Sequence, residues 1–186
     1  MHMFQDLFGK QPLIVSLEAN PTVHQKIEQL ANAGIQNIEL MSYAPNVLAK
    51  AKQRFPEIKL AQANIQTIEA LEQAHALHLD FLSSPGFLAP LAQTAQLYKM
   101  PYMPGINNMS EAMQARHYGF HDLRVFPGNL ELCKLLSKYA PDLKIYPMDV
   151  DWNQIEQFLD LPNIAAISLT DPDALQIADI AESLKI

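Results

Sequence analysis

The sequence predicts an α/β protein that folds as a single-domain (β/α)8 TIM barrel over residues 1–186. Short apolar runs alternate with longer segments of helical periodicity along the whole chain. Strand starts recur at about 20 to 24 residues, so that eight strand–helix units fit the length. No Gly/Ser-rich segment or run of like charges offers a linker, and we therefore expect one domain.

The first unit combines a strand at 13–17 with an amphipathic helix at 21–33, which Gly34 terminates. Asn108 and Glu111 have the spacing of a capping box, and Asp151 is placed to cap a later helix. The remaining units pair strands 37–41, 59–63, 79–83, 101–104, 122–126, 144–148 and 164–169 with helices 46–54, 67–77, 88–97, 108–117, 130–139, 152–159 and 172–184.

An open doubly wound sheet is the main alternative architecture. It is disfavoured because no Gly-rich turn follows the first strand, where Glu18-Ala19-Asn20-Pro21 stands instead. The barrel requires very short loops, since 186 residues is below its usual size. In a barrel, the active site would lie at the carboxyl ends of the strands.

Composition restricts the class of partner. A net charge of −7 and a pI near 5.3 argue against a nucleic-acid backbone or an anionic membrane surface. Charged residues make up only 18% of the chain, which favours surface covered by other subunits. The amino terminus lacks the pattern of a signal peptide, no apolar run is long enough to span a membrane, and Cys133 is the only cysteine. We therefore expect a cytoplasmic protein.

Two charged residues, Glu39 and Arg124, lie inside strands that are otherwise mainly apolar. They could form a buried ion pair with no catalytic role. Alternatively they line a pocket, where Arg124 grips a ligand carboxylate and Glu39 handles a proton. The full set of polar residues expected at strand carboxyl ends is Glu18, Glu39, Asn64, Ser84, Asn107, Arg124, Asp149, Asp151 and Thr170.

A divalent-cation site is a second possibility, because Asp149, Asp151 and Glu39 offer oxygen ligands that suit magnesium or manganese. Two acidic residues at such a spacing are more often solvated or cap the next helix. We interpret Cys133 as a small buried apolar residue. The six histidines, interpreted as surface or packing residues, are His2, His24, His75, His78, His117 and His121.

Several short motifs follow one another in a specific order. They are Ala33-Gly34-Ile35 before Ile38-Glu39-Leu40, then Phe81-Leu82-Ser83-Ser84-Pro85-Gly86, Pro104-Gly105-Ile106, Ser110-Glu111, Tyr118-Gly119 and Leu123-Arg124-Val125-Phe126-Pro127. In these motifs the chain resembles the 2-keto-3-deoxy-6-phosphogluconate and 4-hydroxy-2-oxoglutarate aldolases, over nearly its whole length.

The resemblance implies a (β/α)8 barrel, usually a homotrimer, that cleaves 4-hydroxy-2-keto acids through a Schiff base. It assigns the general acid/base to Glu39 and the position of the Schiff-base lysine to Arg124. A guanidinium stays protonated and cannot form the carbinolamine that an amine forms. The residues expected to bind substrate are Tyr43, Asn64, Ser84, Pro85, Gly86, Pro104, Phe126, Met148 and Asp149.

Other positions also depart from the family pattern. Tyr43 stands where the family has a substrate-binding arginine. Met148-Asp149-Val150 stands where the family has a glycine-rich phosphate loop, and the charge of Asp149 would repel phosphate. We therefore expect a diverged member, whose status as an enzyme is open, that binds a small keto acid or carboxylate without cofactor or metal. The alternatives are a metal-assisted carbon–carbon lyase and a non-enzymatic binding module.

Overall fold

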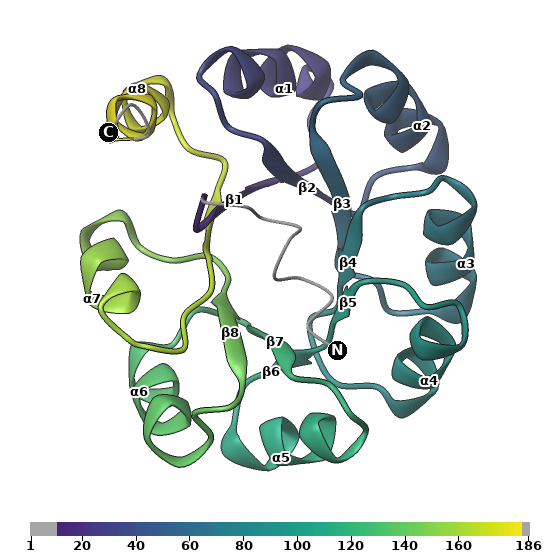
Figure 1. The fold of residues 1–186 in the computed structure, drawn as a ribbon. Coiled ribbons are helices and arrows are strands. Elements are labelled where there is room, and N and C mark those ends of the chain that lie inside the picture. The colour runs from purple at the N-terminus through teal and green to yellow at the C-terminus, as the bar shows by residue number, and fades with distance from the viewer. Residues whose placement is uncertain (1–10, 184–186) are drawn as a thin grey trace.

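The computed structural model describes residues 11–183 and has an α/β architecture, in which a ring of helices surrounds the parallel strands (Figure 1). The strands are β1 (Leu13–Leu17), β2 (Asn37–Met41), β3 (Lys59–Ala63), β4 (Phe81–Ser83), β5 (Tyr102–Met103), β6 (Gly105–Ile106), β7 (Asp122–Val125), β8 (Lys144–Pro147) and β9 (Ile167–Thr170). The helices are α1 (Val23–Asn32), α2 (Pro45–Arg54), α3 (Ile68–Ala76), α4 (Ala89–Leu97), α5 (Met109–His117), α6 (Leu130–Tyr139), the 3-10 helix η1 (Trp152–Gln154), α7 (Ile155–Leu159) and α8 (Ala174–Ser183).

The strands form two hydrogen-bonded sheets, with the orders β5-β4-β3-β2-β1-β9 and β6-β7-β8. All neighbouring strands are parallel. The last strand, β9, lies beside β1, an order that the doubly wound alternative does not have. The predicted α/β class is therefore confirmed. The predicted closed barrel is confirmed only in part, because the strands form two separate hydrogen-bonded sheets.

Pro104 divides the single strand predicted at 101–104 into β5 and β6. Proline has no backbone N–H to donate to a neighbouring strand, although its carbonyl oxygen still accepts a hydrogen bond. The backbone N–H of Arg124 donates to that oxygen at 3.0 Å. At the other edge, the Val150 N–H donates to the carbonyl oxygen of Ser168 at 3.0 Å, which brings the segment after β8 to β9.

Local capping signals explain several helix starts. The Asn108 side chain accepts from the Glu111 N–H at 2.9 Å, as the predicted capping box requires. The Glu111 carboxylate reaches Asn107 N–H at 2.8 Å, one residue before the cap. Asp151 occupies the residue before η1, but its side chain makes no capping hydrogen bond, so the capping role predicted for it is wrong.

Some predicted boundaries shift by a turn or less. The predicted helix 152–159 begins as the 3-10 helix η1 before it becomes α7, and the last strand begins at Ile167 rather than at residue 164. Gly34 adopts a φ of 85° directly after the α1 cap, a left-handed conformation that glycine accepts without steric cost. This confirms its predicted role as the helix terminator.

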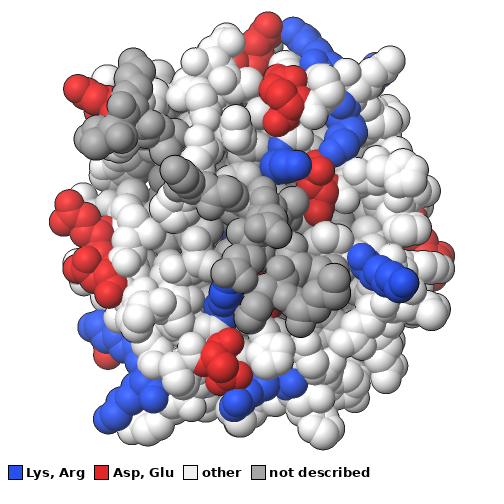
Figure 2. Space-filling view, viewed as in Figure 1, with Lys and Arg blue, Asp and Glu red and all other residues white. Residues whose placement is uncertain are grey.

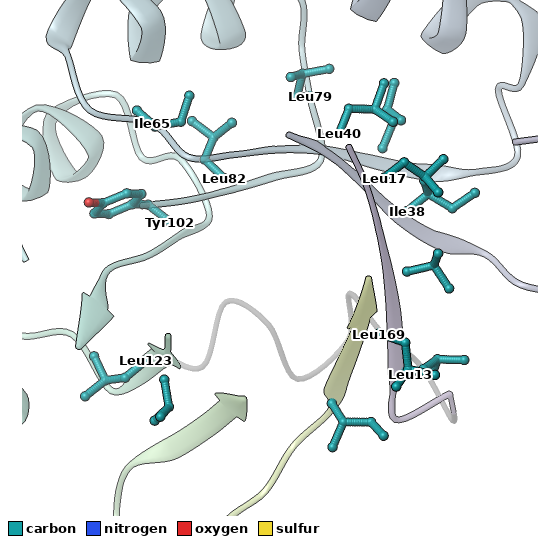
Figure 3. Packing of buried hydrophobic residues seen from close by; sticks show 14 of the residues in the cluster. Leu13, Leu17, Ile38, Leu40, Ile65, Leu79, Leu82, Tyr102, Leu123 and Leu169 are labelled. Atoms are coloured by element: carbon teal, nitrogen blue, oxygen red, sulfur yellow. The ribbon is translucent and has the colours of Figure 1, made fainter. Parts of the chain in front are cut away.

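Buried apolar residues form two clusters. The larger lies between strands and helices, and Figure 3 shows Leu17, Leu40 and Leu82 from three strands of the larger sheet within it. The smaller cluster comprises Ile14, Ala61, Phe81, Met103, Tyr146 and Ala166, with Ala165 packed against it. Strand side chains alternate between two faces, so the smaller cluster fills the side of the strands opposite the helices.

Surface charges of both signs are interspersed. On the face in Figure 2, Lys and Arg side chains lie among Asp and Glu side chains. Exposed ion pairs include Arg54 with Glu28 at 2.8 Å and Lys134 with Glu131 at 2.7 Å. Within residues 11–183, no helix is long and apolar enough to cross a membrane.

Candidate functional site

Glu39 on β2 and Arg124 on β7 meet in the interior as an ion pair. Nη2 of Arg124 donates a hydrogen bond to Oε1 of Glu39, and both side chains are 0% exposed. Their strands belong to different sheets, so the pair links the two sheets. The sequence left open a buried ion pair and a pocket lined by the two residues, and the structure shows the buried ion pair.

Three serine hydroxyls complete the surroundings of the Glu39 carboxylate. Ser16 donates to Oε1 at 2.5 Å, Ser168 to the same oxygen at 3.3 Å, and Ser83 to Oε2 at 3.3 Å. The hydroxyls of Ser16 and Ser168 are also 2.5 Å apart. Several acceptor sites of the buried carboxylate are thereby satisfied, as burial of a charge requires.

None of these three serines was predicted to contact Glu39. Ser16 and Ser168 each interrupt an apolar strand run, and that interruption was the available signal. The register of β1 against β2 pairs Ser16 directly with Glu39. The register is set by tertiary pairing, however, and could not be fixed from strand patterns alone.

Arg124 retains unused donors. Its Nε and Nη1 are buried and have no hydrogen-bond partner among the described residues. Burial away from water lowers the pKa of the guanidinium from 12.5 to about 9, which leaves it protonated at neutral pH. The adjacent Glu39 carboxylate favours that charged form. A buried N–H without an acceptor is costly, so the arrangement favours an additional acceptor beside Arg124.

A small cavity lies near the carboxyl ends of the strands. Its volume is about 20 Å³, which suffices for about one water molecule. Ser83 lines it and connects it to the Glu39 network. The cavity brings together five of the residues predicted to bind substrate, and its full lining is Met41, Asn64, Ser83, Ser84, Pro85, Phe126 and Met148.

The predicted Ser-Pro-Gly turn packs directly against Gly105. A Cβ atom on Gly105 would lie 2.3 Å from the Ser84 carbonyl oxygen and 2.6 Å from the Gly86 nitrogen. The Ser84 hydroxyl lies 2.6 Å from the Tyr102 hydroxyl and donates to the Gly86 carbonyl at 2.8 Å. Two motifs of the resemblance thus form one rigid wall beside the cavity.

Tyr43 does not line the small cavity. Its hydroxyl donates to the Glu18 carbonyl at 2.5 Å and accepts from the Asn20 N–H at 2.8 Å, which fixes the loop between β1 and α1. Burial raises the pKa of this phenol, and the ring is only 8% exposed. Tyr43 borders a separate, larger cavity with Glu18.

The acidic residues after β8 are not brought together with Glu39. Asp149 and Asp151 are exposed, whereas Glu39 is fully buried. No group of three or more His, Cys, Asp or Glu side chains suited to a metal occurs within residues 11–183. The three carboxylates of Glu39, Asp149 and Asp151 therefore do not form the predicted group of metal ligands in this structure.

The remaining candidate residues differ in their burial. Asn107 is exposed, and Thr170 is half-buried at the end of β9 with a hydroxyl that has no described partner. Cys133 is fully buried, and burial raises the pKa of its thiol to about 12, as expected for a packing residue. The described histidines are exposed or half-buried, and His2 lies outside the described residues.

Comparison with solved structures shows the same fold elsewhere. The 2-keto-3-deoxy-6-phosphogluconate aldolase of Zymomonas mobilis, solved with 3-phosphoglycerate, superposes with a TM-score of 0.86 at 20% identity, over 98% of this chain and 94% of that chain. The KDPG aldolase of Legionella pneumophila, with pyruvate captured as a covalent carbinolamine, gives a TM-score of 0.83 at 22% identity, over 95% and 93% of the two chains.

Sequence comparison agrees with the fold. A 2-dehydro-3-deoxy-phosphogluconate aldolase of Pseudomonas aeruginosa is 22% identical over 84% of this chain and 75% of its own length. A protein of the same name from Treponema pallidum is 26% identical over 82% and 77%. The family model of KDPG and KHG aldolase matches residues 10–185. The chain therefore belongs to the KDPG and KHG aldolase family.

Proposed function

We propose that this chain is a family member without Schiff-base chemistry, in which Arg124 binds the carboxylate of a small 2-keto acid or a related carboxylate. The observation that carries the proposal is the buried Arg124 guanidinium, which retains two nitrogen donors without a described acceptor. A carboxylate is the acceptor that best matches the planar donor set of arginine. Glu39 would position the guanidinium and supply the proton-handling carboxylate.

The absence of an amine at this position supports the loss of covalent chemistry. A guanidinium that is protonated at neutral pH cannot attack a ketone. Lys59 and Lys144 are the first residues of β3 and β8, and therefore lie at the amino ends of their strands. The small cavity lies at the opposite ends, where Asn64, Phe126 and Met148 follow their strands.

Binding of a keto acid requires the small cavity to widen. Its volume of about 20 Å³ is smaller than a pyruvate molecule. Met148 is an unbranched side chain with several rotatable bonds, and Phe126 is only half-buried. We expect rotation of these two side chains, which line the cavity, to enlarge it.

A second candidate is a non-enzymatic module in which the ion pair is purely structural. The complete burial of Glu39 and Arg124 favours it, because neither side chain contacts solvent. The two candidates differ in what loss of Arg124 does. The first predicts loss of ligand binding, and the second predicts loss of stability alone.

Calorimetric titration with pyruvate and 2-oxoglutarate tests the proposal. Arg124→Met should abolish keto-acid binding, whereas Arg54→Met should leave it unchanged, since Arg54 lies in an exposed ion pair. If Arg124→Met is folded and binds as the wild type does, the proposed role of Arg124 is wrong. If the wild type binds neither acid, the structural candidate is favoured.

We also propose that the two sheets close into a single-domain (β/α)8 barrel over residues 1–186, and that the protein is a homotrimer. The contact of the β8 segment with β9 and the pairing of β9 with β1 support closure. Exposed apolar side chains on the outer helices support assembly, among them Leu97, Leu135 and Tyr139. Light scattering coupled to size-exclusion chromatography would test the trimer, and a monomeric mass would contradict it.

A further inference from the structure

A second cavity, larger than the small cavity beside Ser83, lies elsewhere in the described part of the chain. It has a volume of about 270 Å³ and lies where β1 and β9 lead into their following loops, against α1. This volume is close to the lower end of the range for small-molecule sites, which is about 300 Å³. The lining residues are Leu17, Glu18, Asn20, Val23, Lys26, Tyr43 and Asp171, so the two cavities share no residue.

Hydrogen bonds to backbone atoms hold the walls of this larger cavity. The Tyr43 hydroxyl fixes the β1–α1 loop through Glu18 and Asn20, as described above. Nζ of Lys26 on α1 donates to the Pro172 carbonyl at 2.6 Å, which ties α1 to the β9–α8 loop. The Asp171 N–H donates to the Ser16 carbonyl at 2.9 Å. The cavity is therefore largely preformed.

Charged groups of both signs line this cavity. Lys26 uses one N–H on Pro172, and its ammonium has two further donors. Asp171 accepts the Glu18 N–H through Oδ2 at 3.2 Å, which leaves Oδ1 without a described hydrogen bond. The Glu18 carboxylate is exposed and has no described hydrogen bond. One cationic and two anionic groups are thus available to a ligand.

We propose that the larger cavity is a binding site for a free α-amino acid. The ammonium group of the ligand would lie against the carboxylates of Asp171 and Glu18, and its carboxylate would receive the free N–H groups of Lys26. A dicarboxylate or phosphate would meet two like charges, and a simple amine would leave Lys26 without a partner. The neighbouring Leu17 and Val23 provide an apolar wall for a ligand side chain.

This site goes beyond the keto-acid proposal and does not depend on it. An α-amino acid differs from the corresponding 2-keto acid by carrying an ammonium group in place of the ketone. The small cavity is proposed to bind through Arg124, and the larger cavity through Lys26 and Asp171. Variants in one cavity therefore leave the other intact, and failure of one proposal is distinguishable from failure of the other.

The experiment is calorimetric titration of the full chain with individual protein amino acids to millimolar concentration. The control ligands for each amino acid are the 2-keto acid and the primary amine that carry the same side chain. At least one amino acid should bind. Lys26→Met and Asp171→Asn should each weaken that binding about tenfold or more, because each removes a charge-assisted hydrogen bond to the ligand. Lys50→Met should leave it unchanged, because Lys50 is exposed on α2.

Folding of the variants is checked by circular dichroism, since Lys26 also holds Pro172. Asp171→Asn retains an oxygen that can accept the Glu18 N–H, and Lys26→Arg retains the charge. Asp171→Asn therefore keeps the test valid if Lys26→Met is unfolded. The proposal is overturned if no amino acid binds, if the amine or the keto acid binds at Lys26 as tightly as the amino acid, or if folded Asp171→Asn binds like the wild type.

Discussion

Arg124 and Glu39 lie 85 residues apart in the chain and form an ion pair whose two side chains are fully buried. The family resemblance assigns the nucleophile position to Arg124 and the general acid/base to Glu39. In this chain the two positions neutralise each other's charge instead. The pair also joins the two sheets, because β2 belongs to one and β7 to the other.

Removing one partner of this pair should be strongly destabilising. Glu39→Gln or Arg124→Met leaves a buried group without its counter-charge, and we expect each to lower the free energy of unfolding by about 3–5 kcal/mol. The double variant Glu39→Leu/Arg124→Met should lose less than the sum of the two single losses. Urea denaturation measures all three.

The exposed Arg54–Glu28 pair provides the control for this experiment. Both of its side chains are about half exposed, so Arg54→Met should change stability by about 1 kcal/mol or less. If Arg124→Met proves as mild as Arg54→Met, the interior pair does not hold the sheets together.

Gly105 should tolerate no side chain. A Cβ atom would lie within 2.6 Å of backbone atoms in the Ser84-Pro85-Gly86 turn, so Gly105→Ala must displace that turn. We expect a loss of about 1–3 kcal/mol, the usual cost of overpacking. Gly86→Ala is the matched control, because nothing lies within 4 Å of its added Cβ atom. Equal losses for the two variants would contradict the close packing of the motifs.

The Cys133 thiol should be unreactive in the folded protein. Burial raises its pKa to about 12 from its ordinary value of 9.0, so little thiolate forms in the folded state at pH 8 to 9. Labelling with a thiol reagent should be slow until the protein unfolds. Cys133 is the only cysteine, so the signal comes from one site. Rapid labelling of the folded protein would show that the α6 interior is accessible.

The same pKa shift has a consequence for stability. The thiol ionises more readily in the unfolded chain than in the folded one. The contribution of the buried thiol to the free energy of unfolding is therefore fully present below pH 9. It is lost as the pH rises from about 9 toward 12. Cys133→Ala should therefore show a smaller decline in unfolding free energy over this range. The wild-type curve compared with the variant curve measures the difference.

Local sequence signals predicted most elements because each depends on few residues. Asn108 with Glu111 marked the start of α5, and Gly34 marked the end of α1. The alternation of apolar runs located the strands, although it could not reveal that Pro104 splits one of them. Helix and strand boundaries shifted where tertiary hydrogen bonds, rather than local patterns, decide where an element ends.

The candidate site was only partly predictable. Charges in apolar strands identified Glu39 and Arg124, and a buried pair was one of two arrangements considered. The serines around Glu39 and the cavity beside Lys26 depend on strand register and on loops far apart in the chain. Such contacts leave no local pattern. Asp149 and Asp151 do not form the predicted group with Glu39, because both are exposed after β8 whereas Glu39 is buried.

Arg124→Lys should place an amine at the position that the family resemblance assigns to the nucleophile. A lysine there would be buried beside Glu39, and burial lowers the pKa of an amine, which makes it a better nucleophile. We expect this variant to gain a covalent product with pyruvate after borohydride reduction. Intact-mass measurement detects the product, and a folded variant that remains unmodified would mean that pyruvate does not reach this position.

The most direct measurement is the same trapping experiment on the unaltered protein. The chain is incubated with pyruvate and borohydride, and its intact mass is determined. Because Arg124 cannot form an imine and the strand lysines lie at the amino ends of β3 and β8, the predicted mass is that of the unmodified chain. A reduced pyruvyl adduct on any lysine would show that Schiff-base chemistry persists and would contradict the proposed function.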